Sequence, residues 1–520
     1  MASRTIDAAE LRNVILGSAE HALLDVREAQ EFVANHILTA SNTPLSRLEM
    51  AMPRLVPRRS TPVVLCDGGD DLAVRAAEVL EKLGYRDICT LQGGTRAWSH
   101  AGFVLFEGSN VPSKAFGEIV EIVCHTPALD AEEVKHRVDA GDNLVILDSR
   151  PWDEYRDFNI PGGIDCPNSE LAYHVRDLVP DPETTIVVNC AGRTRSIIGC
   201  QTLVNAGVPN PVFALRNGTI GWEWAGLELE RGADRRHGEA SDVARNWAQS
   251  QCEKLAQRAG VKLIDCEALA AWRDEADEVS LYVFDVREPE EFAFGSLAGA
   301  ISAQGTQLVQ ATDEYLAVRE GRIVLVDDTG VRARMTASWL KQLGYPHVAV
   351  LEDDVRDLAE LFVPGEQTSA ACIAPQTACD DGWTLLDLSS STTYRAGHPQ
   401  GAFWGLRSRV GEMVAGLPAG RPVAILDDEH GHLAALAVSE LARQGIEARV
   451  LSEGLSGWRQ AGLVVSVGGE GMLSAMIDTP DMPFDLTGDP EAAKRAYIDW
   501  ELQLPDQIKR DGLLTFEPLS

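Results

Sequence analysis

The chain has 520 residues and a formal net charge of −33 at pH 7, from 79 acidic and 46 basic side chains. Hydrophobic residues make up 45% and charged residues 24%, which are ordinary globular values and exclude wholesale disorder. The length predicts about three to five domains. The excess of carboxylates disfavours a surface for nucleic acid or another polyanion.

The N-terminal stretch has no basic segment followed by an apolar one, and no apolar run reaches the ~18–20 residues of a membrane helix. We therefore expect a cytoplasmic protein with no membrane partner. The ten cysteines are too sparse for a disulfide scaffold, and none forms a Cys-x-x-Cys pair. Free thiols and no metal site are predicted.

In chain order, one pattern occurs four times. An apolar strand ends in Asp and leads into a polar turn and a helix: LLDVREAQEF, VILDSRPWDEY, YVFDVREPEEF and TLLDLSSSTTY. About 40 residues after each Asp comes a second apolar strand: TPVVLC, TIVVNC, RIVLVD and PVAILD. A helix follows and is predicted to end at Gly84, Gly207, Gly344 or Gly445.

A third strand completes each repeat, and a turn with Trp closes three of the four: GGTRAWSHAGF, NGTIGWEWAGL and EGLSGWRQAGL. Strands that alternate with helices at this spacing predict α/β domains with a doubly wound parallel sheet. We predict four of them in tandem, at 1–110, 115–232, 260–366 and 370–470. Segment 233–259 is interpreted as a helical linker. Segment 471–520 is interpreted as an acidic tail that packs on the domains, because it is too aromatic for a free linker.

The loop after the second strand is expected to carry the chemistry, because sites of open parallel sheets lie at the carboxyl ends of strands. In the second repeat it reads Cys190-Ala191-Gly192-Arg193-Thr194-Arg195-Ser196. Backbone N–H groups, the dipole of the following helix and two arginines all favour a negative sulfur, and so predict a lowered thiol pKa. Cys190 is the candidate nucleophile, and the six residues after it are the candidate substrate-binding residues.

The Asp-x-Arg-x-x-x-Glu-[Phe/Tyr] element, the strand–Cys–loop–helix unit and the Gly-x-x-x-Trp turn resemble the rhodanese family over about 470 of the 520 residues. The resemblance implies a sulfurtransferase. Cys190 would carry sulfur as a persulfide from thiosulfate or a similar donor to a thiophilic acceptor such as cyanide or a thiol. The implied partners are small molecules or a thiol protein, and no cofactor is needed.

The other three loops depart from this pattern. The first reads Cys66-Asp67-Gly68-Gly69-Asp70-Asp71; we interpret it as one residue longer with its cysteine kept, which makes Cys66 a candidate secondary site. The third has Asp327 in place of the cysteine. The fourth, which starts at Asp427, supplies neither Cys nor Arg. The last two domains are predicted to be inert.

Two other functions fit part of the pattern. A dual-specificity phosphatase of the cell-division-cycle type shares the fold that the resemblance implies. Its phosphate loop has five residues between Cys and Arg, whereas four separate Cys190 from Arg195. The second alternative is a non-enzymatic scaffold or sensor built of decayed modules, which the three altered loops favour in part.

Overall fold

The computed structural model describes residues 4–358, 370–480 and 489–519. In this part of the chain, four parallel five-stranded sheets follow one another, one for each predicted repeat. The strands of all four have the same spatial order. The second sheet runs β6 (Ala128–Leu129), β10 (Val212–Leu215), β9 (Thr185–Asn189), β7 (Leu144–Asp148) and β8 (Ile164–Asp165). The predicted doubly wound α/β class is confirmed.

The other sheets repeat this arrangement. The first runs β1 (Arg4–Ile6), β5 (Ile88–Leu91), β4 (Val63–Cys66), β2 (Ala22–Asp25) and β3 (Ser41–Asn42). The third runs β11 (Lys262–Ile264), β15 (Val348–Leu351), β14 (Arg322–Val326), β12 (Leu281–Asp285) and β13 (Ile301–Ser302). The fourth runs β16 (Cys372–Ile373), β21 (Ala448–Leu451), β20 (Val423–Leu426), β17 (Thr384–Asp387) and β19 (Phe403–Trp404).

The helix after each central strand ends shortly before the glycine that was predicted to end it. These helices are α4 (Leu72–Lys82), α10 (Thr194–Ala206), α17 (Val331–Gln342) and α21 (His432–Arg443). The glycine shortly after each has a positive φ, between 72 and 92°, which only glycine adopts without strain. The shorter helices that bear on the site are α8 (Trp152–Asp157), α9 (Asn168–Leu178), α11 (Gly218–Trp224) and α14 (Pro289–Phe294).

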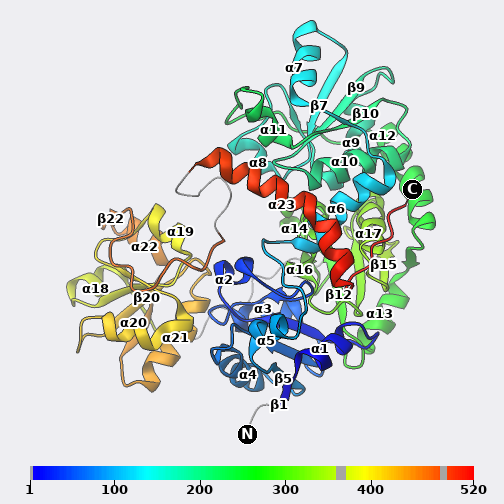
Figure 1. Cartoon of the computed structure of the whole chain (residues 1–520). Coiled ribbons are helices and arrows are strands. Elements are labelled where there is room, and N and C mark those ends of the chain that lie inside the picture. Colours follow the sequence, from blue (N-terminus) through cyan, green and yellow to red (C-terminus); the bar gives the residue numbers. More distant parts are fainter. Residues whose placement is uncertain (1–3, 359–369, 481–488, 520) are drawn as a thin grey trace.

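Three longer helices join the repeats. Helix α6 (Val111–Cys124) lies between the first and second, and α12 (Asp242–Arg258) lies in the segment interpreted as a linker and packs on α9 and α17. Helix α23 (Pro490–Asp511) lies in the predicted tail and packs along α6, as the red and cyan helices in Figure 1 show. Residues 1–3, 359–366, 481–488 and 520 of the predicted domains and tail are outside the described residues.

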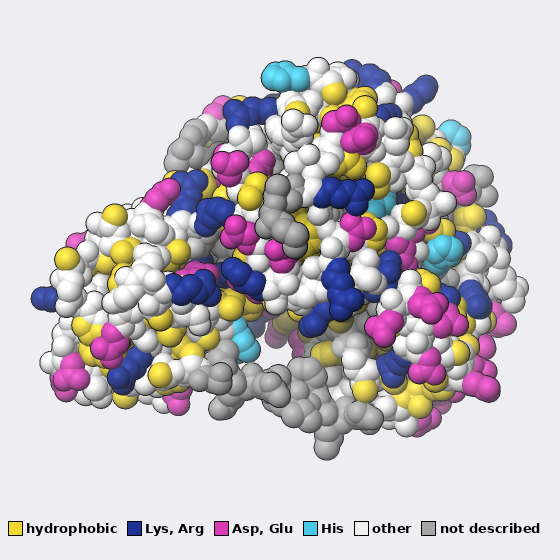
Figure 2. Space-filling view, turned by 90° about the horizontal axis from the view of Figure 1, so that it is seen from below, with side chains coloured by type: hydrophobic (Ala, Val, Ile, Leu, Met, Phe, Trp, Pro, Cys, Tyr) yellow, Lys and Arg dark blue, Asp and Glu magenta, His cyan; other side chains and the backbone are white. Residues whose placement is uncertain are grey.

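The first three repeats share one core. A single cluster of buried side chains includes Leu65, Phe116, Ile198 and Leu325, and so draws on all three repeats and on α6. The fourth repeat has apolar clusters of its own. In Figure 2 it is the lobe at the left, and acidic and basic side chains are interspersed over both lobes. None of the helices in the described ranges is long and apolar enough to cross a lipid bilayer.

Candidate active site

Cys190 is the first residue beyond the central strand of the second sheet. The register pairs Asp148 of β7 with Asn189, the last residue of β9, so the chain turns into its loop at Cys190. The Thr219 N–H donates to the Cys190 carbonyl at 2.8 Å. A Cβ on Gly218, the first residue of α11, would lie 2.1 Å from the same oxygen, so only glycine allows this contact. The closing turn with Trp thus holds the nucleophile loop in place.

The net effect on the Cys190 thiol differs from the expectation. Its side chain is buried, with 2% of the residue exposed. Burial raises the pKa of the Cys190 thiol. The positive charges of Arg195 and Arg150 and the hydrogen bonds from Ser196 act to lower it. The predicted net lowering of the pKa is wrong, because removal from water disfavours the thiolate more than these groups favour it.

Both loop arginines are engaged by glutamates. Arg195 donates two hydrogen bonds to Glu154, at 2.7 and 2.8 Å. Arg193 donates two bonds of 2.7 Å to Glu118 on α6 and pairs with Glu121 as well. We expected both guanidinium groups to be available to an anionic donor. Carboxylates already occupy much of their hydrogen-bonding capacity.

The pair between Arg195 and Glu154 belongs to the fold. Glu154 is the Glu of the Asp-x-Arg-x-x-x-Glu element in the second repeat. In the third repeat Arg332, at the position of Arg195, pairs in the same way with Glu291. Because that repeat has no loop cysteine, the pair does not depend on sulfur chemistry. It favours a role for Arg195 in the rigidity of the loop.

The Cys190 loop forms one wall of a pocket of about 630 Å³. The predicted residues Ala191, Gly192, Arg193, Thr194 and Arg195 all line it. Ser196 does not; its hydroxyl donates to the Arg193 carbonyl at 2.8 Å. The pocket's other walls bring in residues that no motif marked: Lys114 of α6, and Tyr497, Trp500 and Glu501 of α23. For the three residues of α23, the only sequence signal is the helical spacing of aromatic and apolar residues in the tail.

Lys114 differs from the loop arginines. In the described part of the chain no carboxylate lies within ion-pair distance of its Nζ, which instead lies over the rings of Trp500 and Tyr497, 4.9 and 5.2 Å from their centroids. Burial lowers the pKa of the Lys114 ammonium, and Glu501 partly offsets that effect. Lys114 thus brings a cation without a carboxylate partner to the pocket wall.

The strand registers place an aspartate at the position of Cys190 in each of the other repeats. Asp25 of β2 pairs with Cys66, just as Asp148 pairs with Asn189, so Cys66 corresponds to Asn189 and Asp67 to Cys190. The interpretation that the first loop keeps its cysteine is wrong, because Cys66 lies one position before the residue that corresponds to Cys190. Cys66 is fully buried in β4, where burial and Asp25 raise its thiol pKa well above its ordinary value.

In these repeats the aspartate side chain takes the hydrogen bonds of its own loop. Asp67 accepts from the N–H groups of Gly69 and Ala73, at 2.7 and 2.9 Å. Asp327 accepts from Gly330 and Ala333, at 2.6 and 3.1 Å. Asp427 accepts from three loop and helix N–H groups in the same way. In these three loops, the N–H groups that could bind an anion are therefore already bonded to a carboxylate of the chain itself.

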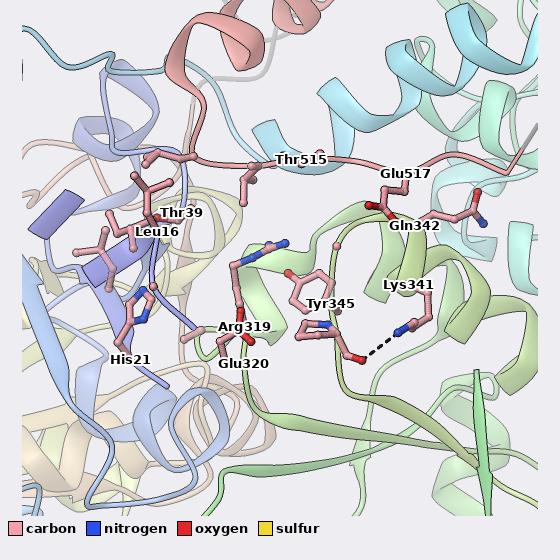
Figure 3. Close-up of a pocket in the computed structure, with 18 of the residues that line it drawn as sticks. Leu16, His21, Thr39, Arg319, Glu320, Lys341, Gln342, Tyr345, Thr515 and Glu517 are labelled. Atoms are coloured by element: carbon pink, nitrogen blue, oxygen red, sulfur yellow. Dashed lines mark hydrogen bonds between the residues drawn. The ribbon is translucent and has the colours of Figure 1, made fainter. Parts of the chain in front are cut away.

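A second pocket, of about 580 Å³, lies where the first repeat, the third repeat and the C-terminal segment meet (Figure 3). His21, Arg319, Tyr345 and Thr515 are among its lining residues. Burial lowers the pKa of His21, and the lining includes no cysteine. It offers no nucleophile for sulfur chemistry.

The described residues also contain one group of metal-ligand side chains, although none was predicted. The ligand atoms of Glu170, His174 and His237 lie within 4.8 Å of one another. Arg332 lies 3.4 Å from Glu170 and already supplies positive charge, and together with the two histidines it lowers the pKa of Glu170 to about 2. The arrangement fits a buried ion-pair network between the second and third repeats.

Comparisons with known proteins agree with this geometry. A rhodanese-like domain matches residues 7–101, 130–225 and 251–360. A thiosulfate sulfurtransferase from Pseudomonas aeruginosa, known from a crystal structure, is 44% identical in sequence. Its structure matches with a TM-score of 0.95, and the match covers 99% of this chain and 100% of that one.

Curated relatives match over shorter stretches. An HTH-type transcriptional regulator of Mycobacterium tuberculosis is 31% identical over 112 residues, which are 22% of this chain and 48% of the regulator. An uncharacterized Bacillus subtilis protein is 39% identical over 82 residues, which are 16% of this chain and 64% of that protein. The chain thus spans about half to two thirds of the length of these relatives. The domain matches and the full-length structural likeness show that the chain belongs to the rhodanese family, as a transferase of the rhodanese type.

Proposed function

We propose that this protein is a sulfurtransferase that takes sulfane sulfur from thiosulfate or a similar donor and carries it as a persulfide on Cys190. The observation that carries the proposal is the strand register: of the four loop positions, all of them described, only the second holds a cysteine. The thiosulfate sulfurtransferase of Pseudomonas aeruginosa, similar over the whole chain, supports thiosulfate as the donor.

In the donor step the Cys190 thiolate attacks the outer sulfur of thiosulfate. A Cys190 Sγ–S bond forms, the S–S bond of the donor breaks, and its electron pair leaves with sulfite. The donor is a dianion, so its entry into a buried site requires nearby positive charge. Lys114 fits this role best, because the two loop arginines are paired with glutamates. The acceptor then removes the outer sulfur and restores the thiolate.

The test is mass spectrometry of the intact chain and of its proteolytic peptides after treatment with thiosulfate. We expect an adduct of about 32 Da, the mass of one sulfur atom, on the Cys190 peptide. Cys190→Ser should lose both the adduct and sulfur transfer to cyanide. Cys66→Ser is the matched control and should retain both. Transfer that survives in Cys190→Ser would overturn the assignment.

The two alternatives have their own readouts in this experiment. Hydrolysis of an aryl phosphate without turnover of thiosulfate would support a phosphatase. No adduct with thiosulfate, a mercaptopyruvate or a persulfide donor would support a scaffold. The loop favours neither, because its Cys-to-Arg spacing is one residue short for phosphate and its cysteine is retained.

A further inference from the structure

Helix α23 of the C-terminal segment forms a wall of the Cys190 pocket. A Cβ on Gly192 would lie 3.4 Å from a ring carbon of Tyr497 and 3.6 Å from Oε2 of Glu501, so the helix lies directly against the nucleophile loop. Trp500 lines the same pocket. Two aromatic rings and one carboxylate, all from outside the four sheets, thus face the loop.

Glu501 is the unusual member of this wall. Only 1% of the residue is exposed. Its Oε1 accepts a hydrogen bond of 2.7 Å from the Tyr497 hydroxyl, whereas its Oε2 is buried and has no hydrogen-bond partner among the described residues. A buried oxygen without a donor raises the free energy of the folded state. A proton-bearing ligand beside Gly192 would supply the missing donor.

The charges around Glu501 suit a base. Burial raises the pKa of its carboxyl group, and Glu118 of α6 adds to the rise. Lys114, the Tyr497 hydroxyl and Arg193 act in the opposite sense. A carboxylate whose pKa is raised accepts a proton more readily than an exposed one, and this is how enzymes adapt carboxyl groups to neutral pH.

We infer that Glu501 is the base of an acceptor subsite between α23 and the Cys190 loop, and that this subsite takes a small organic thiol. The inference rests on the proposed sulfurtransferase function and deepens it by naming the acceptor class. The rings of Tyr497 and Trp500 offer an apolar wall for the carbon chain of such a thiol. Cyanide ion has neither a carbon chain nor a proton to give up.

The transfer step balances with Glu501 alone. Glu501 takes the proton of the acceptor thiol as its sulfur attacks the outer sulfur of the Cys190 persulfide. A new S–S bond forms in the product, the Cys190 Sγ–S bond breaks, and its electron pair stays on Cys190 as the thiolate. Glu501 then returns the proton to the terminal sulfur of the product persulfide. No outside oxidant or reductant is consumed.

The experiment separates loading from transfer in the full-length protein. The chain is first loaded with thiosulfate, the persulfide is quantified by mass, and single-turnover release of sulfur is then followed with a small thiol or with cyanide at a pH where cyanide is anionic. Glu501→Gln should load normally, should slow transfer to the thiol by about 100-fold, and should leave transfer to cyanide unchanged. Asp506→Asn, an exposed change on the same helix, is the matched control.

A second variant guards against a structural effect. Tyr497→Phe removes the hydrogen bond that lowers the pKa of Glu501, so the acid limb of the pH–rate profile for the thiol should move to higher pH. If Glu501→Gln slows both acceptors equally, or leaves the thiol rate unchanged, Glu501 is not the base. If the wild-type chain forms no persulfide with any donor, the proposed function itself fails, and that outcome is visible before an acceptor is added.

Discussion

At the scale of single residues, one exchange distinguishes the second repeat from the others. Asp67 and Asp327 occupy the position of Cys190 in their repeats. Their carboxylates accept hydrogen bonds from the loop N–H groups that would otherwise face a persulfide or a bound anion. A carboxylate cannot carry sulfane sulfur, and its negative charge repels an anionic donor. The exchange therefore removes the chemistry while the loop stays hydrogen-bonded.

Lys114 is the residue whose contribution to donor binding can be isolated. A hydrogen bond to a charged group contributes about 1.5–3 kcal/mol, so Lys114→Gln should raise the KM for thiosulfate by ~10- to 100-fold. Steady-state kinetics with cyanide as acceptor measures this change. Lys509→Gln, an exposed change on α23, should leave KM unchanged. Equal KM values for the wild-type and Lys114→Gln proteins would assign donor binding to the arginines instead.

At the scale of elements, the strands and helices could be predicted because their signals are local. Buried apolar runs and terminal glycines marked the strands and the helices after them, and the structure has them there. The error at Cys66 arose because a shift of one position separates the last residue of the strand from the first residue of the loop. Sequence letters show two adjacent candidates, Cys66 and Asp67, and only the pairing of Asp25 with Cys66 decides between them.

The contribution of α23 to the pocket could not be predicted for a different reason. Glu501 and Lys114 are about 390 positions apart, and nothing local in either segment specifies that their two helices meet at one pocket. The spacing of Tyr497, Trp500 and Leu504 predicts a helix with one buried face. It does not say what that face covers. Tertiary packing on α6 decides this, and the site residues from both helices were missed for that reason.

A substitution at Gly108 tests how strongly activity depends on the position of α23. Its φ is +88°, and a Cβ there would lie 2.4 Å from the Trp500 ring. Gly108→Ala should therefore displace Trp500, lower the free energy of unfolding by about 1–3 kcal/mol and reduce sulfur transfer. Gly102→Ala has the same backbone strain, with φ +85°, but its Cβ would meet nothing within 4 Å. Urea unfolding and transfer assays of both variants isolate the clash; equal losses would show that backbone strain alone is responsible.

At the scale of the whole molecule, the first three repeats form one body and the fourth is attached to it by polar contacts. The shared apolar cluster includes residues of all three repeats and is joined by Phe516 near the C-terminal end. The fourth repeat meets the first through ion pairs such as Arg407 with Glu49 and Arg47 with Glu429. We therefore expect the active repeat to depend for its stability on the third repeat, although the third has no loop cysteine.

Arg332 is the most direct test of that dependence. It is 2% exposed and joins Glu291 and Asp328 of its own repeat to Glu170 on α9 of the second, where Glu170 lies 3.4 Å away. Arg332→Ala leaves the buried Glu170 and the largely buried Asp328 without this cation, which should lower the free energy of unfolding by about 3–5 kcal/mol. Arg356→Ala removes a largely exposed partner of the same Asp328 and should cost about 0–1 kcal/mol. Urea unfolding monitored by tryptophan fluorescence measures both. If the two variants lose the same small amount, the buried network does not hold the second and third repeats together.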